Sequence, residues 1–242
     1  MMYTFYCQIK SGKTLLAVFM LVIGNLIGPA HAADDFKQQE LVDRASLALD
    51  SFNSDEDMQQ FRAYVKYAHG IIIVPNLIRG AWLVGAAGGT GVLLVRDQTY
   101  GGWSPPAFYS LRSISAGLQV GVSTSEVILL IMTEKGLDLL ASNTSVKLGA
   151  DVSVAAGTAG YSVEAATPMN FSADYVSFAR SKGAYMGMGL SGTAIVPKHN
   201  WNQAYYNEPV LPSAITAGIV SNSAADGLRQ AMAKFFTDNA SQ

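Results

Sequence analysis

Short apolar runs that recur at close spacing after residue 70 are the feature that most constrains this fold. They are rich in β-branched and aliphatic residues, and the segments between them are rich in Gly, Ser and Asn. They predict strands at 71–74, 91–95, 113–122, 127–132, 146–150, 152–156, 175–180, 185–190 and 193–196. Pro75 is expected to end the first strand. Because parallel strands need a crossover of a dozen residues or more, links this short predict an antiparallel sheet.

Helical patterns lie on both sides of these strands. Apolar residues at helical spacing predict two N-terminal helices over 34–52 and 54–68, with Ser54 capping the second, and a C-terminal helix over 223–236. A short helix is expected at 134–141. This order indicates an α+β fold with a curved antiparallel sheet, either a sandwich or a partly closed barrel, flanked by N-terminal and C-terminal helices.

The first residues have the pattern of a secretory signal peptide. Lys10 and Lys13 precede an apolar run over 15–27, and Ala30-His31-Ala32 forms a small-residue cleavage site. We expect a signal peptide over 1–32 with cleavage after Ala32, a single domain over 33–242, and a periplasmic or secreted protein. The alternative is a retained membrane anchor, for which the apolar run is short.

Composition excludes several classes of protein. Cys7 is the only cysteine and would leave with the signal peptide, so no disulfide and no cysteine metal ligand are expected. Loss of Lys10 and Lys13 changes the formal net charge from −2 to −4, which argues against nucleic-acid binding. Eight acidic and four basic residues lie within 34–66, and the rest of the chain is poor in charge.

The sequence lacks the usual arrangements of catalytic and metal-binding residues. His69 and His199 have no histidine partner at ligand spacing, and neither H-E-x-x-H nor G-x-S-x-G occurs. Residues 187–192 match G-x-G-x-x-G, but a strand-like segment follows where a dinucleotide site needs a helix. We therefore expect no enzyme, no catalytic residue, no metal and no cofactor. The least favoured alternative is a hydrolase that uses two of Glu126, Asp151, Glu164 and Asp174.

Four basic residues stand near strand ends in the charge-poor body: Arg96, Lys147, Arg180 and Lys182. Arg180-Ser181-Lys182 places two cations and a hydroxyl on one turn, a chemistry suited to phosphate oxygens. The alternative role of such a turn is to guard a hydrophobic strand against aggregation.

The segment from Gly80 to Tyr109 combines glycines with aromatic residues. Trp103 and Phe108 are candidates for the membrane interface, where aromatic rings are favoured, or for the core. The glycines between Gly85 and Gly91 lack the Lys-Ser/Thr pair of a phosphate-binding loop, so they are expected to allow close packing and curvature of the sheet.

An ordered set of motifs resembles the SYLF-domain family, also described as the actin-binding domain of certain yeast endocytic proteins. The matching segments cover nearly the whole chain after the signal peptide and are 68–71, 88–94, 103–108, 117–121, 147–151, 154–157, 175–185 and 202–206. They include Gly88-Gly89-Thr90-Gly91-Val92, Trp103-Ser104-Pro105-Pro106 and Arg180-Ser181-Lys182-Gly183.

The resemblance implies a non-catalytic lipid-binding domain for phosphoinositides or other anionic phospholipids, with actin binding in some members. For an exported chain it implies a phospholipid or membrane surface in the envelope, with Arg96, Trp103, Phe108, Lys147, Arg180 and Lys182 as candidate lipid contacts. Actin is not an expected partner in that compartment. The alternative function is a structural or protein-interaction module of the cell envelope. One departure from the family is the acidic stretch at 34–66, which an anionic membrane surface repels.

Overall fold

The computed structural model describes residues 31–81, 84–97, 102–116, 121–142, 144–157, 173–181, 184–186 and 189–240. The helices are α2 (His31–Ser54), η1 (Glu56–Met58), α3 (Gln59–Val65), α4 (Glu134–Ala141), α5 (His199–Tyr206), α6 (Pro212–Thr216), η3 (Ser223–Ala225) and α7 (Asp226–Ala240). The strands are β1 (Gly70–Ala81), β2 (Val84–Asp97), β3 (Gly102–Trp103), β4 (Ala107–Ala116), β5 (Gly121–Ile131), β6 (Val146–Lys147), β7 (Val154–Ala156), β8 (Tyr175–Ser181), β9 (Ala184–Met186) and β10 (Thr193–Pro197).

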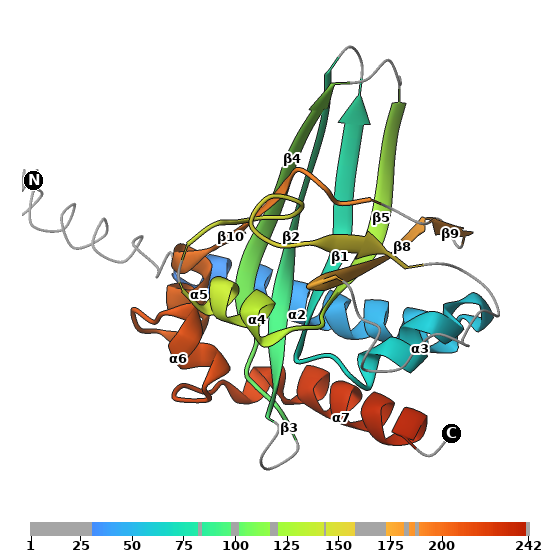
Figure 1. Ribbon diagram of the computed structural model, residues 1–242. Helices are drawn as coiled ribbons and strands as arrows, with labels where there is room; N and C mark the ends of the chain where they lie inside the picture. Colours follow the sequence, from blue (N-terminus) through green and yellow to red (C-terminus); the bar gives the residue numbers. More distant parts are fainter. Residues whose placement is uncertain are drawn as a thin grey trace, which may run out of the picture.

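The described strands form one curled sheet, so the partly closed barrel is the correct one of the two predicted forms (Figure 1). Its main order is β6-β10-β4-β2-β1-β5-β8-β7, with β3 beside β2 and β9 beside β8. The predicted α+β class and flanking helices are confirmed. Among the named strands that the structure describes, pairing is antiparallel except between β7 and β8, which are joined through residues 157–174 and are parallel. That connection is longer than the other strand links and is long enough for a crossover. An isolated parallel bridge also joins Leu148 and Val152.

Aromatic rings join three helices to one face of this sheet. Phe61 of α3 contacts Phe52 of α2, Phe178 of β8 and Phe235 of α7, with ring centroids 5.4 to 5.5 Å apart. Phe108 of β4 lies in the same pairing row as Phe178 and therefore faces the same side. We call this side the helix face.

Helix α4 covers the opposite side of the sheet. The hydroxyl of Tyr109 donates to the Leu140 carbonyl at 3.0 Å, and that of Tyr175 donates to the Gly136 carbonyl at 2.6 Å. Each phenol is buried and its pKa is raised because burial disfavours the phenolate. Both hydroxyls are therefore neutral donors that fix α4 against the sheet.

Several local predictions were wrong. The strand predicted over 113–122 is not one strand, because β4 ends at Ala116 and β5 begins at Gly121, and the strand predicted over 185–190 does not include residues 189–190. Pro75 does not end β1, because the strand passes it through a register shift between Val74 and Leu77 and continues to Ala81. A bulge accommodates proline since the residue at the irregularity makes no ladder hydrogen bond. Ser54 is the last residue of α2, and Asp55 caps the next turn by accepting from the Asp57 amide at 3.1 Å.

Glycines of β2 allow the sheet to approach itself closely at this bulge, as predicted. A Cβ at Gly89 would lie 2.7 Å from the Asn76 carbonyl oxygen, and one at Gly91 would lie 2.5 Å from the Ile73 carbonyl oxygen. A side chain at either position would therefore displace the backbone of β1. These glycines are needed for packing, in agreement with the absence of a phosphate-loop motif.

The predicted signal peptide lies outside the described residues except for its last two positions, which belong to α2. Among the described helices, none has the length and apolar character needed to cross a bilayer.

Candidate functional site

Of the six residues predicted to contact lipid, the five that the structure describes do not form one site. Arg96 lies at the end of β2, where its guanidinium donates to the Lys66 carbonyl at 3.0 Å and lies 3.9 Å from the ring centre of Phe236. Beside it is an open cavity of about 410 Å³, which Arg229 also lines. Arg96 is thus engaged in holding α7 against the end of β2.

Trp103 and Phe108 are side chains of the core. Trp103 is 5% exposed and meets Phe236 edge-on at 6.2 Å, and its carbonyl accepts from Arg229 at 2.9 Å. Phe108 is fully buried between Trp201 and Tyr205 of α5. Of the two roles weighed for these rings, the structure therefore has the core role, because helices α5 and α7 cover them.

The Ser-Pro-Pro turn between these rings is also structural. The Ser104 hydroxyl accepts from the Val95 amide at 2.9 Å and donates to the Pro105 carbonyl at 2.9 Å. Tyr206 donates its hydroxyl to the Pro106 carbonyl at 2.8 Å. The turn thus connects β2 to α5. Its hydroxyl and carbonyl groups are engaged in these internal hydrogen bonds.

Arg180 is neutralised by two carboxylates. Its Nε lies 3.4 Å from Oδ2 of Asp55, and its Nη1 lies 3.7 Å from Oε2 of Glu126. Burial raises the pKa of Glu126, and the charge of Arg180 opposes that rise. This arginine therefore links β8 and β5 to the start of η1. Lys182, its neighbour in the predicted phosphate-binding turn, lies outside the described residues.

Lys147 is exposed, and one strand separates it from Arg112, a basic residue that the sequence analysis did not single out. Ala194 of β10 pairs with Lys147 of β6 on one side and with Arg112 of β4 on the other. Side chains of directly paired residues point to the same face, so both cations flank the small Ala194. Arg112 lies four residues beyond Phe108 on β4, which places this pair on the helix face.

Lys198 adds a third cation near Arg112. Its Nζ lies 3.5 Å from the Thr90 hydroxyl and 3.6 Å from the ring centre of Trp201. Burial lowers the pKa of Lys198, and the positive charge of Arg112 lowers it further. We call Arg112, Lys147 and Lys198 the cationic patch.

No carboxylate in the described part of the chain forms an ion pair with the cationic patch. Asp151 is the acidic residue beside Lys147, and its carboxylate accepts from the Lys147 backbone amide at 2.7 Å. The patch therefore offers guanidinium and ammonium donors to an anion from outside. In the sequence, a buried-type residue precedes each cation, as in Leu111-Arg112 and Val146-Lys147, and this alternation indicates that Arg112 and Lys147 are exposed. Only the pairing of β10 with both strands shows that the two cations share one face.

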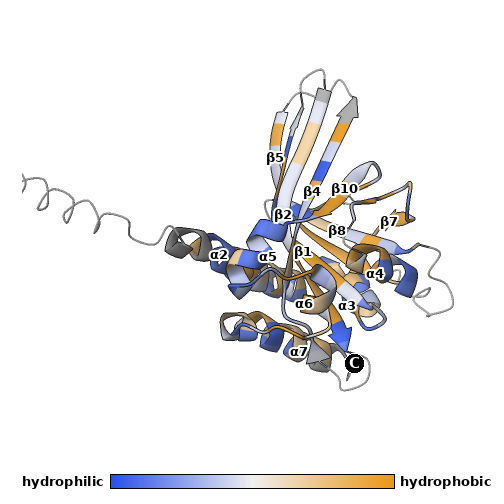
Figure 2. Cartoon of the chain, turned by 90° about the vertical axis from the view of Figure 1, so that its left-hand side faces the viewer, coloured by the Kyte–Doolittle hydropathy of each residue, from blue (hydrophilic) through white to orange (hydrophobic). Residues whose placement is uncertain are grey.

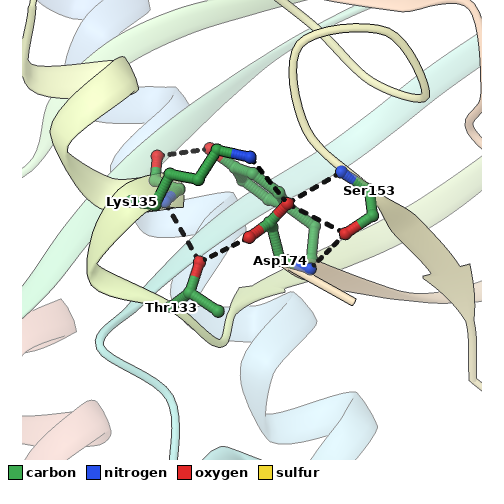
Figure 3. Close-up of polar contacts among 6 residues, drawn as sticks. Thr133, Lys135, Ser153 and Asp174 are labelled. Atoms are coloured by element: carbon green, nitrogen blue, oxygen red, sulfur yellow. Dashed lines mark hydrogen bonds and ion pairs between the residues drawn. The ribbon is translucent and has the colours of Figure 1, made fainter. Parts of the chain in front are cut away.

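A second polar cluster has the residue types of a catalytic site but the geometry of a structural clip (Figure 3). The carboxylate of Asp174 accepts from the Thr133 hydroxyl at 2.8 Å and from the Ser153 amide and hydroxyl at 2.9 and 2.8 Å. Lys135 Nζ lies 3.7 Å away. Burial acts to raise the pKa of Asp174, but the hydrogen bonds and the Lys135 charge hold it below its ordinary value.

These contacts make Asp174 a poor general base, because its proton affinity is low. Its oxygens are occupied by hydrogen bonds that hold neighbouring segments together. Thr133 also caps α4 by accepting from the Gly136 amide at 3.1 Å. The cluster thus fixes the start of α4 to β8 and to the segment before β7. Among the described residues, no group of three or more His, Cys, Asp or Glu side chains is placed to hold a metal ion.

Comparison with known proteins places the cationic patch within a matched region. A family model named Ysc84, described as Las17-binding protein actin regulator, matches residues 112–235. This region contains all three cations of the patch and excludes Arg96, Trp103 and Phe108.

Individual relatives match this chain at low sequence identity. SH3 domain-containing YSC84-like protein 1 of Bos taurus is 23% identical over 208 residues, which cover 86% of this chain and 60% of the bovine protein. The Xenopus laevis protein of the same name is 26% identical over 141 residues, covering 58% of this chain and 42% of that protein. LAS seventeen-binding protein 3 of Saccharomyces cerevisiae is 27% identical over 156 residues, covering 64% of this chain and 34% of the yeast protein.

Proposed function

This chain belongs to the Ysc84 family of Las17-binding protein actin regulators, and we propose that it is a non-catalytic domain that binds anionic phospholipid at a membrane of the cell envelope. The chain spans about 60% of the length of the bovine relative and less of the yeast protein, so the activities of those whole proteins are not transferred to it. The observation that carries the proposal is the cationic patch, whose charges no described carboxylate neutralises.

The strength of such binding follows from the charges. A basic residue near an anionic membrane surface contributes about 1 kcal/mol, so three contribute about 3 kcal/mol, or roughly a hundredfold preference over a neutral surface. Arg112 and Lys147 are exposed, and Lys198 is half-buried beside them.

The proposed role is non-catalytic because three of the four carboxylates considered for a hydrolase have structural partners, and the fourth, Glu164, lies outside the described residues. Asp174 is held by Thr133 and Ser153, and Glu126 lies beside Arg180. Asp151 accepts from the backbone amide of Lys147. The patch itself supplies cations and no nucleophile. These contacts support binding of an anion without turnover of it.

The proposed location rests on the signal-peptide pattern of residues 1–32. An exported protein meets the phospholipid surfaces of the envelope and not cytoplasmic actin. We therefore include a periplasmic or secreted location in the proposal.

Flotation with vesicles tests the proposed binding. The chain from Ala33 contains every residue of the hydrophobic core, which runs from Val42 to Phe235. We expect it to float with vesicles of phosphatidylcholine and phosphatidylglycerol, to float far less with phosphatidylcholine alone, and to be released by high salt. Equal recovery with the two vesicle types, or no flotation, would contradict the proposal.

A second candidate function is a protein-interaction module of the envelope. The names of the family and of the yeast relative, which describe binding to Las17, favour a protein partner. Purification of the native protein from its cell envelope distinguishes the two functions. A stoichiometric protein partner without bound phospholipid would favour the second candidate, and co-purifying anionic phospholipid would favour the first.

A further inference from the structure

Four strands extend beyond the helices to form a projecting sheet, which we call the finger (Figure 1). It consists of residues 77–81 of β1, 84–89 of β2, 111–116 of β4 and 121–125 of β5. Antiparallel pairing continues along it, as between Ala81 and Gly121 and between Val84 and Ala116. The finger is therefore a hydrogen-bonded extension of the sheet.

Large aliphatic side chains are exposed on the helix face of the finger. Ile114 and Val122 are each 81% exposed and Ile78 is 54% exposed. Ile114 pairs with Ala86, Ala86 with Gly80, and Gly80 with Val122, so these residues form one row across four strands. Figure 2 shows hydrophobic residues near the outer ends of β4 and β5. Two aliphatic side chains thus flank a low surface of Ala and Gly that faces solvent.

The charges of the finger are of one sign. Arg79 and Arg112 are its charged residues, and its four segments contain no Asp or Glu. Arg112 precedes Ile114 by two residues on the same face, which places it about 7 Å closer to the helices along the strand. In an anionic bilayer, the charged headgroup layer lies above the apolar acyl chains at a comparable spacing. The finger therefore complements an anionic bilayer in charge and in polarity.

The backbone limits how deeply the finger can enter lipid. Strand β10 pairs with β4 as far as Ser113, and β8 pairs with β5 as far as Glu126. Beyond these residues, β4 and β5 are the outer strands of the finger among the described pairings. Their outward N–H and C=O groups would lack partners in hydrocarbon, which costs several kcal/mol for each group. Shallow insertion at the level of the headgroups avoids this cost.

We propose that the finger inserts shallowly into an anionic lipid bilayer, with Ile114 and Val122 below the headgroups and Arg79, Arg112 and the row of Ile78 at the level of the phosphates. This inference rests on the proposed function, because it names the part of the domain that enters the membrane. It adds an apolar contribution that the cationic patch does not supply.

A fluorescent label at single positions tests insertion directly. Cys7 is the only cysteine, so the chain from Ala33 has none and accepts Ile114→Cys as a unique labelling site. Asp138→Cys on the exposed side of α4 is the control. With anionic vesicles, we expect an environment-sensitive label at 114 to shift to the blue and to be quenched by brominated acyl chains, and the label at 138 to do neither. Flotation without any change at 114 would overturn the inference.

Substitutions separate this inference from the proposed function. Ile114→Ser with Val122→Ser removes apolar surface from exposed positions, and thermal unfolding checks that the fold is retained. We expect about tenfold weaker binding to anionic vesicles with the preference for anionic lipid intact. Binding equal to that of the parent chain would overturn insertion while the cationic patch stands. If the parent chain binds no vesicle and captures a protein through this face, both proposals are wrong.

Discussion

Arg112 and Lys147 point to the same face of the sheet because Ala194 pairs with each of them. The two cations come from strands that are far apart in the chain, and a small residue between them leaves both side chains exposed. Lys198 follows the same strand β10 and adds its charge near Arg112. One short strand thus assembles the cationic patch.

Removal of charge from the patch should weaken lipid binding by a predictable amount. Lys147→Gln is expected to reduce affinity for anionic vesicles about fivefold, and Arg112→Gln with Lys147→Gln about thirtyfold, since each cation contributes about 1 kcal/mol. Lys234→Gln removes an equal charge from an exposed position on α7 and is the control. Vesicle titration at low salt measures the affinities. Equal losses for Lys147→Gln and Lys234→Gln would show that net charge, not the patch, governs binding.

Gly91 should tolerate no side chain. Gly91→Ala would place a Cβ 2.5 Å from the Ile73 carbonyl oxygen and 2.7 Å from Cγ2 of Val74, so we expect a loss of about 1–3 kcal/mol in the free energy of unfolding. At Gly88 the nearest atom to an added Cβ is the Leu111 carbonyl oxygen at 3.9 Å, and Gly88→Ala is expected to be nearly neutral. Urea denaturation measures the two values. Similar losses in the two variants would contradict the packing role.

Asp174→Asn should destabilise the fold in a pH-dependent manner. The amide nitrogen would face donors from Ser153 or Thr133, so we expect a loss of about 2 kcal/mol at pH 7. The folded-state pKa of Asp174 lies below its ordinary value of 3.8, so its carboxylate stabilises the fold above that pH. This contribution is lost as the pH falls through the folded-state pKa.

The stability advantage over Asp174→Asn should therefore shrink as the pH falls below 3.8. Urea denaturation at neutral and acidic pH measures this change. Asp138→Asn, at an exposed position of α4, is the control and should show little difference at either pH. A constant difference between the parent chain and Asp174→Asn at all pH values would show that the clip does not depend on the charge of Asp174.

Processing after Ala32 is expected if the chain is exported. The intact mass of protein recovered from the cell envelope should correspond to a chain that begins at Ala33. Ala30→Arg should block processing, because the cleavage site needs small residues at Ala30 and Ala32. An uncleaved chain in the cytoplasm would contradict export and with it the proposed location.

Local patterns in the sequence predicted the elements of this fold well. The alternation in 193–196 and the helical period in 223–236 depend on neighbouring residues, and each appears as expected in β10 and in η3 with α7. The family resemblance is also confirmed, because ordered motifs survive where overall identity is low. The path of β1 past Pro75 was not predicted, because a bulge depends on the partner strand as well as on the proline.

The sequence by itself determined the α+β class, the glycines that the sheet needs and the family of the chain, because these follow from residue type and short-range spacing. Only the tertiary structure decided which cations are available. Arg180 is neutralised by Asp55, and Arg96 lies against Phe236, whereas Arg112 and Lys147 each pair with Ala194 and point to the same face. Charge pairing depends on strand register and helix docking between distant segments, and a single sequence contains no local signal for either.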